Sequence, residues 1–413
     1  MMEKKTVVIF GAGQIGRGFI GDICSGSGYS LVFVDVDENL VKALNGEKEY
    51  PLWLLGEAKT ERKITGFSAL SFSETDKIAE AISGTELAFT AVGVNNLRSL
   101  APLIAAGIKK KSAEKPASHL NIVICENLLG SAKVLKESVE KHLEGHSLSF
   151  LNEKTGFVET VVSRMVSPLP ESLRREQPLL VTVEPYNVLP VDKKKFKGEI
   201  PTVKGFYPVE NLFPYEELKL FMHNLLHACL AYAGYLKGCE YIWEALGDGD
   251  IKKVLNGVMN EAKSALTKKH HFETPEIENY ISDLIKRFGN KLLGDTVYRV
   301  GRDPLRKIGA NDRIAGAIKL CLSNNVFPEN ICFVMACCLC YNYPDDLKAV
   351  ELQEILKGKG VAFVLKEISG LNQEDILNRI TEDYNGIQNE SGGFKKAGGT
   401  FRRRDFNTLS GRQ

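Results

Sequence analysis

A glycine-rich turn near the start of the chain directly follows a short β-branched run. The segment VVIFGAGQIGRG places Gly11, Gly13 and Gly16 in G-x-G-x-x-G spacing, after an expected strand and at the start of an expected helix. Gly11 allows the tight turn, Gly13 lets the backbone approach a pyrophosphate, and Gly16 lets helix and strand pack closely. The free N–H groups at a helix start attract phosphate. The pattern predicts a βαβ unit that binds a dinucleotide.

A second expected strand, YSLVFVDVD, ends at Asp35, about 20 residues beyond the last glycine, where a carboxylate can accept hydrogen bonds from a ribose. This favours NAD over NADP, because a 2′-phosphate would face a negative charge. The alternative is a strand-end aspartate that starts a turn, and Asp37 shows that such residues occur there anyway. The segment FTAVGVNN follows another expected strand and would lie along the cofactor. The predicted cofactor-binding residues are Phe10, Gly11, Gly13, Gln14, Ile15, Gly16, Asp35, Ala91, Val92 and Gly93.

Further apolar runs at LAFTAVG and LNIVICEN are continuous, as expected for parallel strands buried on both faces. The sequence therefore predicts an α/β chain with an N-terminal Rossmann-type doubly wound sheet. From about Tyr215 onward the apolar spacing becomes three to four residues, which indicates a mainly α-helical C-terminal domain. We expect an NAD-binding domain over 1–200, a helical substrate and catalytic domain over 201–385, a mobile tail over 386–413, and chemistry in the cleft between the two domains.

Composition excludes several classes of partner and site. The chain has 413 residues and is 44% hydrophobic, enough for a large core, and its 53 basic residues balance 52 acidic ones. We therefore expect no nucleic-acid and no membrane partner, and the start shows neither a signal peptide nor a membrane span, which makes the cytoplasm the expected location. Four of the nine cysteines crowd the apolar stretch ICFVMACCLCY, so we expect reduced thiols in a helical core and no bound metal.

The stretch KLFMHNLLHA places Lys219, Asn224 and His227 within an arc of about 140° on an α-helix. Hydride transfer from an alcohol needs a base for the hydroxyl proton and donors for the alkoxide-like oxygen. A lysine can be that base if desolvation lowers its pKa, and an asparagine amide can be one donor. The alternative is a helix with a snorkelling lysine, a capping asparagine and a core histidine.

The stretch KLFMHNLLH resembles the K-x-x-x-x-N-x-x-H signature of the mannitol dehydrogenase family, the zinc-independent, two-domain, polyol-specific long-chain dehydrogenases. The resemblance implies that Lys219 is the general base, that Asn224 is half of an oxyanion hole, and that His227 holds a substrate hydroxyl. The family's other oxyanion asparagine follows a strand in a C-[DE]-N element, which VICENLLGSA matches at Asn127. The likeness extends to about residue 385.

Within the family, FGAGQIGRGFIG and GRDPLRKIGANDRIAG look most like the members that interconvert mannitol 1-phosphate and fructose 6-phosphate with NAD. In the 15 residues 299–313, Arg299, Arg302, Arg306, Lys307 and Arg313 supply five cations, enough to neutralise a phosphate dianion through forked hydrogen bonds. The alternative is a solvated basic loop whose charges pair with its two aspartates. The predicted substrate contacts among these cations are Arg302 first, then Lys307 and Arg299.

Ser163 departs from the family pattern, because GFVETVVSRMV has Ser-Arg where the family usually has Asp-Arg near the polyol pocket. We include Ser163 among the substrate-binding residues and leave the exact sugar open. Reduction of fructuronate, tagaturonate or free fructose by an enzyme of the same family is the closest alternative. A module that senses NAD without catalysis is another, against which the joint presence of Lys219, Asn127, Asn224 and His227 argues. A zinc alcohol dehydrogenase would need a cysteine–histidine ligand set, which the sequence does not show.

Overall fold

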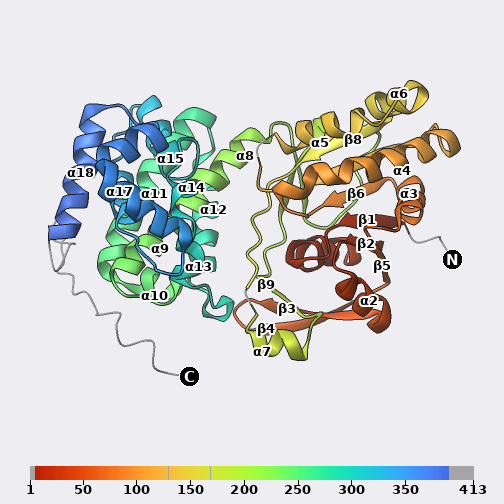
Figure 1. The fold of residues 1–413 in the computed structure, drawn as a ribbon, viewed down its shortest axis with the longest axis horizontal. Helices are drawn as coiled ribbons and strands as arrows, with labels where there is room; N and C mark the ends of the chain where they lie inside the picture. The colour runs from red at the N-terminus through yellow and green to blue at the C-terminus, as the bar shows by residue number, and fades with distance from the viewer. Residues whose placement is uncertain (1–4, 129, 168, 390–413) are drawn as a thin grey trace. The chain divides into compact units, whose positions relative to one another are not determined.

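The computed structural model describes residues 5–128, 130–167 and 169–389. The chain divides into two compact units, Met1–Glu216 and Glu217–Gln413 (Figure 1). The first is built around a sheet, and the second is helical.

A six-stranded sheet organises the N-terminal unit, with every neighbouring pair parallel and the order β5-β2-β1-β6-β7-β8. This is the Rossmann order, with its switch point between β1 and β6, and it confirms the predicted doubly wound sheet. Ligands of such sheets bind outside the carboxyl ends of the strands at this point. The strands are β1 (Thr6–Phe10), β2 (Ser30–Asp35), β5 (Phe67–Ser71), β6 (Leu87–Thr90), β7 (Leu120–Ile124) and β8 (Thr155–Glu159).

Both faces of this sheet are covered, which explains the continuous apolar runs. Along β1, Val7 and Ile9 belong to one core cluster, and Val8 and Phe10 belong to another on the opposite face. All four side chains are fully buried. The helices of the unit are η1 (Gly16–Gly21), α1 (Asp22–Ser25), α2 (Glu38–Glu47), α3 (Thr75–Gly84), η2 (Val94–Leu100), α4 (Ala101–Glu114), α5 (Ser131–Glu140), α6 (Gly145–Lys154), α7 (Glu171–Glu176) and η3 (Lys193–Lys195).

Two small sheets supplement the large one. In the first, β3 (Glu49–Leu55) pairs with antiparallel β4 (Lys59–Thr65) and parallel β9 (Val181–Val183); in the second, β10 (Leu189–Asp192) pairs with β11 (Phe206–Val209). Strand β9 packs on η1 at Gly18, where a Cβ would lie 2.6 Å from the Val181 side chain. The small sheet thereby supports the helix that follows the glycine turn.

Helix α9 (Asn224–Leu236) is the central element of the C-terminal unit and packs against α10, α11, α13 and α16. It is apolar on nearly all sides, as expected for a helix enclosed by others. Helix α8 begins in the first unit and continues through η4 into α9. The helices are α8 (Phe213–Leu218), η4 (Lys219–His223), α9, α10 (Ile242–Gly247), α11 (Gly249–His270), α12 (Thr274–Phe288), η5 (Lys291–Leu293), α13 (Val297–Gly301), α14 (Pro304–Lys307), α15 (Ala315–Ser323), α16 (Glu329–Leu339), α17 (Leu347–Phe363), η6 (Val364–Ile368) and α18 (Glu374–Asn389).

The cysteines of α16 are buried in this helical core, and all nine cysteines are free thiols, as predicted. Within the described ranges, no helix combines the length and the apolar character needed to cross a bilayer. The tail expected over 386–413 lies outside the described residues from 390 onward, and 386–389 form the end of α18.

Candidate active site

The glycine turn lies at the switch point of the sheet, beside the loop that follows β6. Gly11 has φ +93°, and its N–H donates to the Val34 carbonyl at 2.8 Å. A Cβ on Gly11 would lie 2.3 Å from the Ala91 carbonyl oxygen, and one on Gly16 would lie 1.8 Å from the Gly11 carbonyl oxygen. The Ala91 N–H donates to the Phe10 carbonyl at 2.7 Å. The structure therefore brings the predicted residues of both loops together.

Gly13 differs from these two glycines, because a Cβ there would meet no protein atom within 4 Å. Protein packing thus does not require a glycine at this position, whereas close approach of a pyrophosphate to the backbone does. The Oε1 atom of Gln14 is buried and, within the described residues, has no hydrogen-bond partner. An open surface beside a buried polar atom without a partner fits a bound dinucleotide.

Asp35 ends β2 and fixes the glycine turn. Its Oδ2 accepts from the Ala12 N–H at 2.6 Å, and its Oδ1 accepts from the Asp37 N–H at 2.9 Å. Asp37 in turn caps α2 through the N–H groups of Asn39 and Leu40. Asp35 therefore does start a turn, yet each of its oxygens retains a second lone pair that suits a ribose hydroxyl.

Glu126 fixes the loop after β6 in a similar way. It is buried just beyond β7, and its two carboxylate oxygens accept from the Val92 N–H at 2.9 Å and the Gly93 N–H at 3.0 Å. Burial raises the pKa of Glu126, although these hydrogen bonds favour the charged form. Asn127 follows directly and is exposed. From the sequence, Glu126 was recognised only as part of the C-[DE]-N element, and its position between Cys125 and Asn127 was the available signal for its role.

Ser163 is buried in the segment after β8, next to a buried arginine. The Arg164 guanidinium donates to Asp22 Oδ2 at 2.8 Å, to the Gly18 carbonyl at 3.0 Å and to the Glu184 carbonyl at 2.7 Å. Arg164 thereby ties this segment to the helix after the glycine turn, with Asp22 as its carboxylate partner. Contact of Ser163 with a polyol stays a prediction.

In the C-terminal unit, Lys219 begins the π-helical turn η4, and Asn224 closes it by donating its N–H to the Lys219 carbonyl. The hydrogen bond that closes this turn links residues five apart, instead of the four of an α-helix, so the turn is wider. Lys219 and Asn224 therefore share a helix face more closely than a regular α-helix allows. His227 follows one turn later on α9. The sequence predicted a regular helix here, and this wide turn was not predicted. Such turns occur frequently at functional sites.

Lys219 is half-buried. Burial, together with the nearby charge of Arg313, lowers the pKa of Lys219 to about 8. A substantial fraction of the amine is therefore neutral near physiological pH, which is what a general base requires.

His227 is held on two sides. Its Nε2 lies 2.8 Å from Asp295 Oδ2, and its ring stacks on Phe288 with centroids 4.6 Å apart. The other Asp295 oxygen accepts from Arg299 Nε at 2.7 Å. Asp295 was not identified from the sequence, where the only signal was an acidic residue four positions before Arg299.

His223 is buried beside this group, with its ring edge-on to Phe288 at 5.6 Å. Burial, with Arg287 and His227 nearby, lowers the pKa of His223 well below its usual value. His223 therefore remains neutral and adds no charge to the face that carries Lys219.

The predicted phosphate contacts differ in exposure and partners. Arg302 is exposed, and within the described part of the chain its guanidinium makes no hydrogen bond or ion pair. Lys307 is 3% exposed and donates its Nζ to the Arg302 carbonyl. Burial, with Arg313 and Arg306 nearby, lowers the pKa of Lys307 to about 7. Arg299 pairs with Asp295, so Arg302 is the most available of the three.

The two remaining cations of this segment pair with carboxylates. Arg306 contacts Asp303 at 2.9 Å and Asp312 at 3.3 Å, and Arg313 Nε contacts Asp312 at 2.8 Å. For these two arginines, the alternative to phosphate binding therefore holds, because their charges pair with the two aspartates of the same loop.

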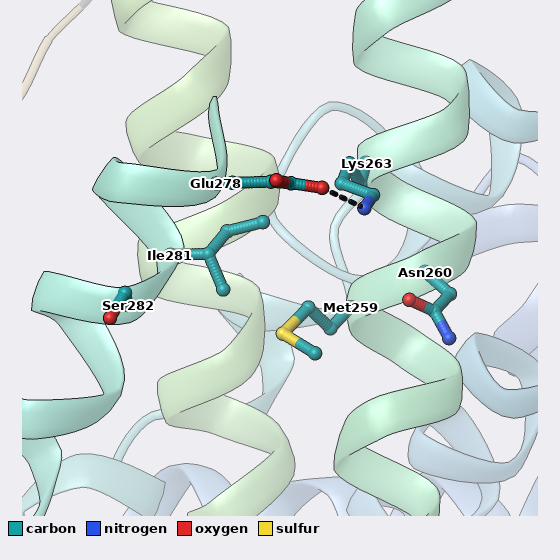
Figure 2. Close-up of a pocket in the computed structure, with 6 residues that line it drawn as sticks. All are labelled: Met259, Asn260, Lys263, Glu278, Ile281 and Ser282. Carbon is teal, nitrogen blue, oxygen red and sulfur yellow. Dashed lines mark hydrogen bonds and ion pairs between the residues drawn. The ribbon is translucent and has the colours of Figure 1, made fainter. Parts of the chain in front are cut away.

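A hollow of about 180 Å³ lies between α11 and α12, lined by Met259, Asn260, Lys263, Glu278, Ile281 and Ser282 (Figure 2). Figure 2 shows the Lys263 amine and the Glu278 carboxylate, 3.3 Å apart, meeting across it. It contains none of the predicted site residues. Among the residues that the structure describes, no group of three or more His, Cys, Asp or Glu side chains is placed to hold a metal ion.

A parallel sheet with a glycine turn at its switch point, joined to a helical unit that carries a lysine of lowered pKa, defines a two-domain dehydrogenase of the Rossmann type. Residues 5–205 match the mannitol dehydrogenase Rossmann domain, and residues 211–388 match the mannitol dehydrogenase C-terminal domain. The chain belongs to the mannitol dehydrogenase family, as the resemblance indicated.

Two relatives illustrate the similarity in sequence. Mannitol-1-phosphate 5-dehydrogenase of Bacillus subtilis (strain 168) is 38% identical over 372 residues, covering 90% of this chain and 97% of the relative. The enzyme of the same name from Thermoanaerobacter pseudethanolicus is 36% identical over 380 residues, covering 91% and 96%. The similarity therefore extends over nearly the whole of these relatives.

Two solved structures share the fold. Pseudomonas fluorescens mannitol 2-dehydrogenase, in a ternary complex with NAD and D-mannitol, has a TM-score of 0.74 at 16% identity and covers 96% of this chain and 94% of its own. A D-sorbitol dehydrogenase in substrate-free form has a TM-score of 0.76 at 15% identity and covers 95% of each chain.

The glycine geometry predicts opposite outcomes for two alanine variants. Gly16→Ala places a Cβ against backbone and should lower the free energy of unfolding by roughly 2 kcal/mol or more, measured by urea denaturation. Gly13→Ala should leave that free energy almost unchanged but weaken NADH binding by about tenfold or more, measured by NADH fluorescence. Normal NADH affinity in a folded Gly13→Ala protein would contradict this account of the turn.

Proposed function

We propose that the protein is an NAD-dependent, metal-independent dehydrogenase that interconverts mannitol 1-phosphate and fructose 6-phosphate. The observation that carries the proposal is the half-buried amine of Lys219, with its pKa lowered to about 8, on the same helix face as Asn224. The names of the relatives support the choice of a hexitol phosphate as substrate. The nine free thiols suit the cytoplasm, which remains our proposed location.

The carboxyl edge of the sheet holds NAD in this proposal. The open backbone at Gly13 receives the pyrophosphate, and Asp35 accepts hydrogen bonds from the ribose hydroxyls, which favours NAD over NADP. Ala91, Val92 and Gly93 line the remaining path, in a loop that Glu126 keeps in place. When bound, NAD accepts the hydride during oxidation and NADH supplies it during reduction.

In oxidation, neutral Lys219 takes the proton of the reacting hydroxyl while the carbon loses a hydride and the C=O bond forms. The side-chain amides of Asn127 and Asn224 donate to the oxygen as it becomes alkoxide-like, which lowers the barrier most if the donors are already in place. His227 holds a neighbouring hydroxyl. In reduction, protonated Lys219 returns the proton to the oxygen.

Arg302 is the first candidate for the substrate phosphate, because its guanidinium is exposed and has no protein partner in the described chain. Lys307 donates to the Arg302 carbonyl and therefore helps to place this residue. Lys307 and Arg299 remain proposed as further contacts, and Ser163 remains proposed as a contact of the polyol hydroxyls. An exposed arginine also suits a carboxylate, which keeps hexuronates as the second candidate substrates.

Substrate preference tests the proposal directly. NADH oxidation should be much faster with fructose 6-phosphate than with fructose, fructuronate or tagaturonate at matched concentrations. Arg302→Ala should raise KM for fructose 6-phosphate by about 10- to 100-fold, because it removes a charge-assisted contact, and should leave turnover of free fructose unchanged. Arg306→Ala, which removes an internally paired arginine of the same segment, is the matched control.

Preference for a uronate or for free fructose would overturn the phosphate assignment and keep the Lys219 chemistry. Absence of activity with all four substrates, together with normal NADH binding, would favour the sensing module. Lys219→Ala separates cofactor binding from catalysis, because this variant should still bind NADH but should lose turnover.

The pH dependence follows from Lys219. Oxidation needs the neutral amine, so kcat/KM for mannitol 1-phosphate should rise with pH up to about 8 and then level. Reduction needs the protonated amine, so kcat/KM for fructose 6-phosphate should fall above that pH. Because the charge of Arg313 helps to lower the pKa, Arg313→Met should move the inflection to higher pH, whereas Arg306→Met should not. An inflection unmoved by Arg313→Met would contradict this electrostatic coupling.

A further inference from the structure

Asp295 binds His227 with one carboxylate oxygen and Arg299 with the other. We propose that Asp295 is a positioning residue that fixes His227 with its proton on Nε2, so that Nδ1 accepts a hydrogen bond from a substrate hydroxyl. The proposal rests on the proposed function and goes beyond it, because it assigns a role to Asp295 and a direction to the hydrogen bond of His227.

The backbone holds Asp295 in a defined place. Its carbonyl accepts from the Ile242 N–H at 2.9 Å, and the next residue, Thr296, forms an isolated β-bridge with Tyr241. The Thr296 hydroxyl then caps α13 by accepting from the Arg299 N–H at 3.1 Å. One short segment therefore fixes both the carboxylate and its arginine, with Asp295 just before the cap of α13 and Arg299 within that helix.

The imidazole of His227 has little freedom to rotate. Phe288 lies nearly parallel to it, with 26° between the ring planes, and Asp295 Oδ2 holds Nε2 at 2.8 Å. A ring flip would break the hydrogen bond to a buried carboxylate, which costs more than losing a bond between neutral groups. The two ring nitrogens therefore have distinct and lasting roles.

The charges around His227 select one protonation state. Burial tends to raise the pKa of Asp295, but His227 and Arg299 outweigh it and hold that pKa below its usual value, so the carboxylate is ionised and only accepts. Nε2 must then carry the proton that Asp295 receives. Burial lowers the pKa of His227, the hydrogen bond to Asp295 only partly offsets this, and Arg299 and Arg313 lower it further. The ring is therefore neutral near physiological pH.

A neutral ring with its proton on Nε2 has a lone pair on Nδ1. Within the described residues, Nδ1 of His227 makes no hydrogen bond. The charged and titratable groups near the ring are Asp295, Arg299, Arg313 and the neutral His223. A hydroxyl can donate to this lone pair, whereas a ketone oxygen cannot. His227 therefore accepts a hydrogen bond from a hydroxyl beside the reacting carbon, while Lys219 and Asn224 contact the reacting oxygen.

Nitrogen NMR of the protein with ¹⁵N-labelled histidine tests which nitrogen of His227 carries the proton. The measurement is made on the wild-type protein, and a variant is needed only to assign the signals. The His227 signals, assigned by their loss in His227→Asn, should show a protonated Nε2 and an unprotonated Nδ1 at neutral pH. The chemical shift of Nδ1 should change when a polyol phosphate is added to the protein with NADH. A proton on Nδ1, or a fully protonated ring, would overturn the proposal whether or not the protein has the proposed activity.

Kinetics of Asp295→Asn give the second test. An asparagine amide can donate to Nε2 and so permits the tautomer with the proton on Nδ1, which cannot accept from a substrate hydroxyl. KM for fructose 6-phosphate should rise by about 10- to 100-fold while the NADH dissociation constant stays unchanged. Asp295→Glu should recover part of the affinity. The matched control is Asp383→Asn, since Asp383 is also buried and pairs at 2.8 Å with an arginine four residues away, Arg379, but on α18.

An unchanged KM in Asp295→Asn would overturn the proposal, and so would an equal rise in Asp383→Asn, which would indicate a general loss of structure. If Asp295→Asn does not fold, the wild-type tautomer decides. Wild-type protein without activity on any hexose phosphate would instead overturn the proposed function and leave the tautomer result standing.

Discussion

Burial of positively charged groups is the constraint on which the C-terminal unit depends. Desolvation lowers the pKa values of Lys219, His223, His227 and Lys307, because water that would stabilise their charged forms is excluded. The arginines beside them keep their charge and lower these values further. Asp295 pairs with Arg299, and Asp312 pairs with Arg313. The amine and the imidazoles can therefore exchange protons or accept hydrogen bonds near neutral pH.

In the N-terminal unit, two carboxylates hold the backbone of loops by accepting hydrogen bonds from N–H groups. Asp35 binds the turn after β1, and Glu126 binds the loop after β6 through two N–H groups. Both loops lie at the switch point of the sheet, where close packing of Gly11 and Gly16 keeps the chain in place. The surface that we propose for NAD is thus formed by the protein's own interactions, and binding requires little further ordering of the loops.

The sequence alone predicted what depends on local pattern. The continuous apolar runs indicated a parallel sheet, the glycine spacing indicated a βαβ unit that binds a dinucleotide, and K-x-x-x-x-N-x-x-H indicated the family. The wide turn at Lys219 could not be predicted in this way, because it changes the hydrogen-bond register without changing the apolar spacing. Asp295 was missed because it meets His227 across 68 residues. Asp22 likewise meets Arg164 across 142 residues, and neither pairing has a local signal.

We propose that burial makes Lys219 a base that works near neutral pH. NMR titration of the protein with ¹³C- and ¹⁵N-labelled lysine measures this directly, with the Lys219 signal assigned by its loss in Lys219→Arg. We expect this amine to titrate near 8, well below the ordinary lysine value of 10.5. Titration near 10.5 would contradict it, because the amine would then remain protonated at neutral pH and could not take the hydroxyl proton.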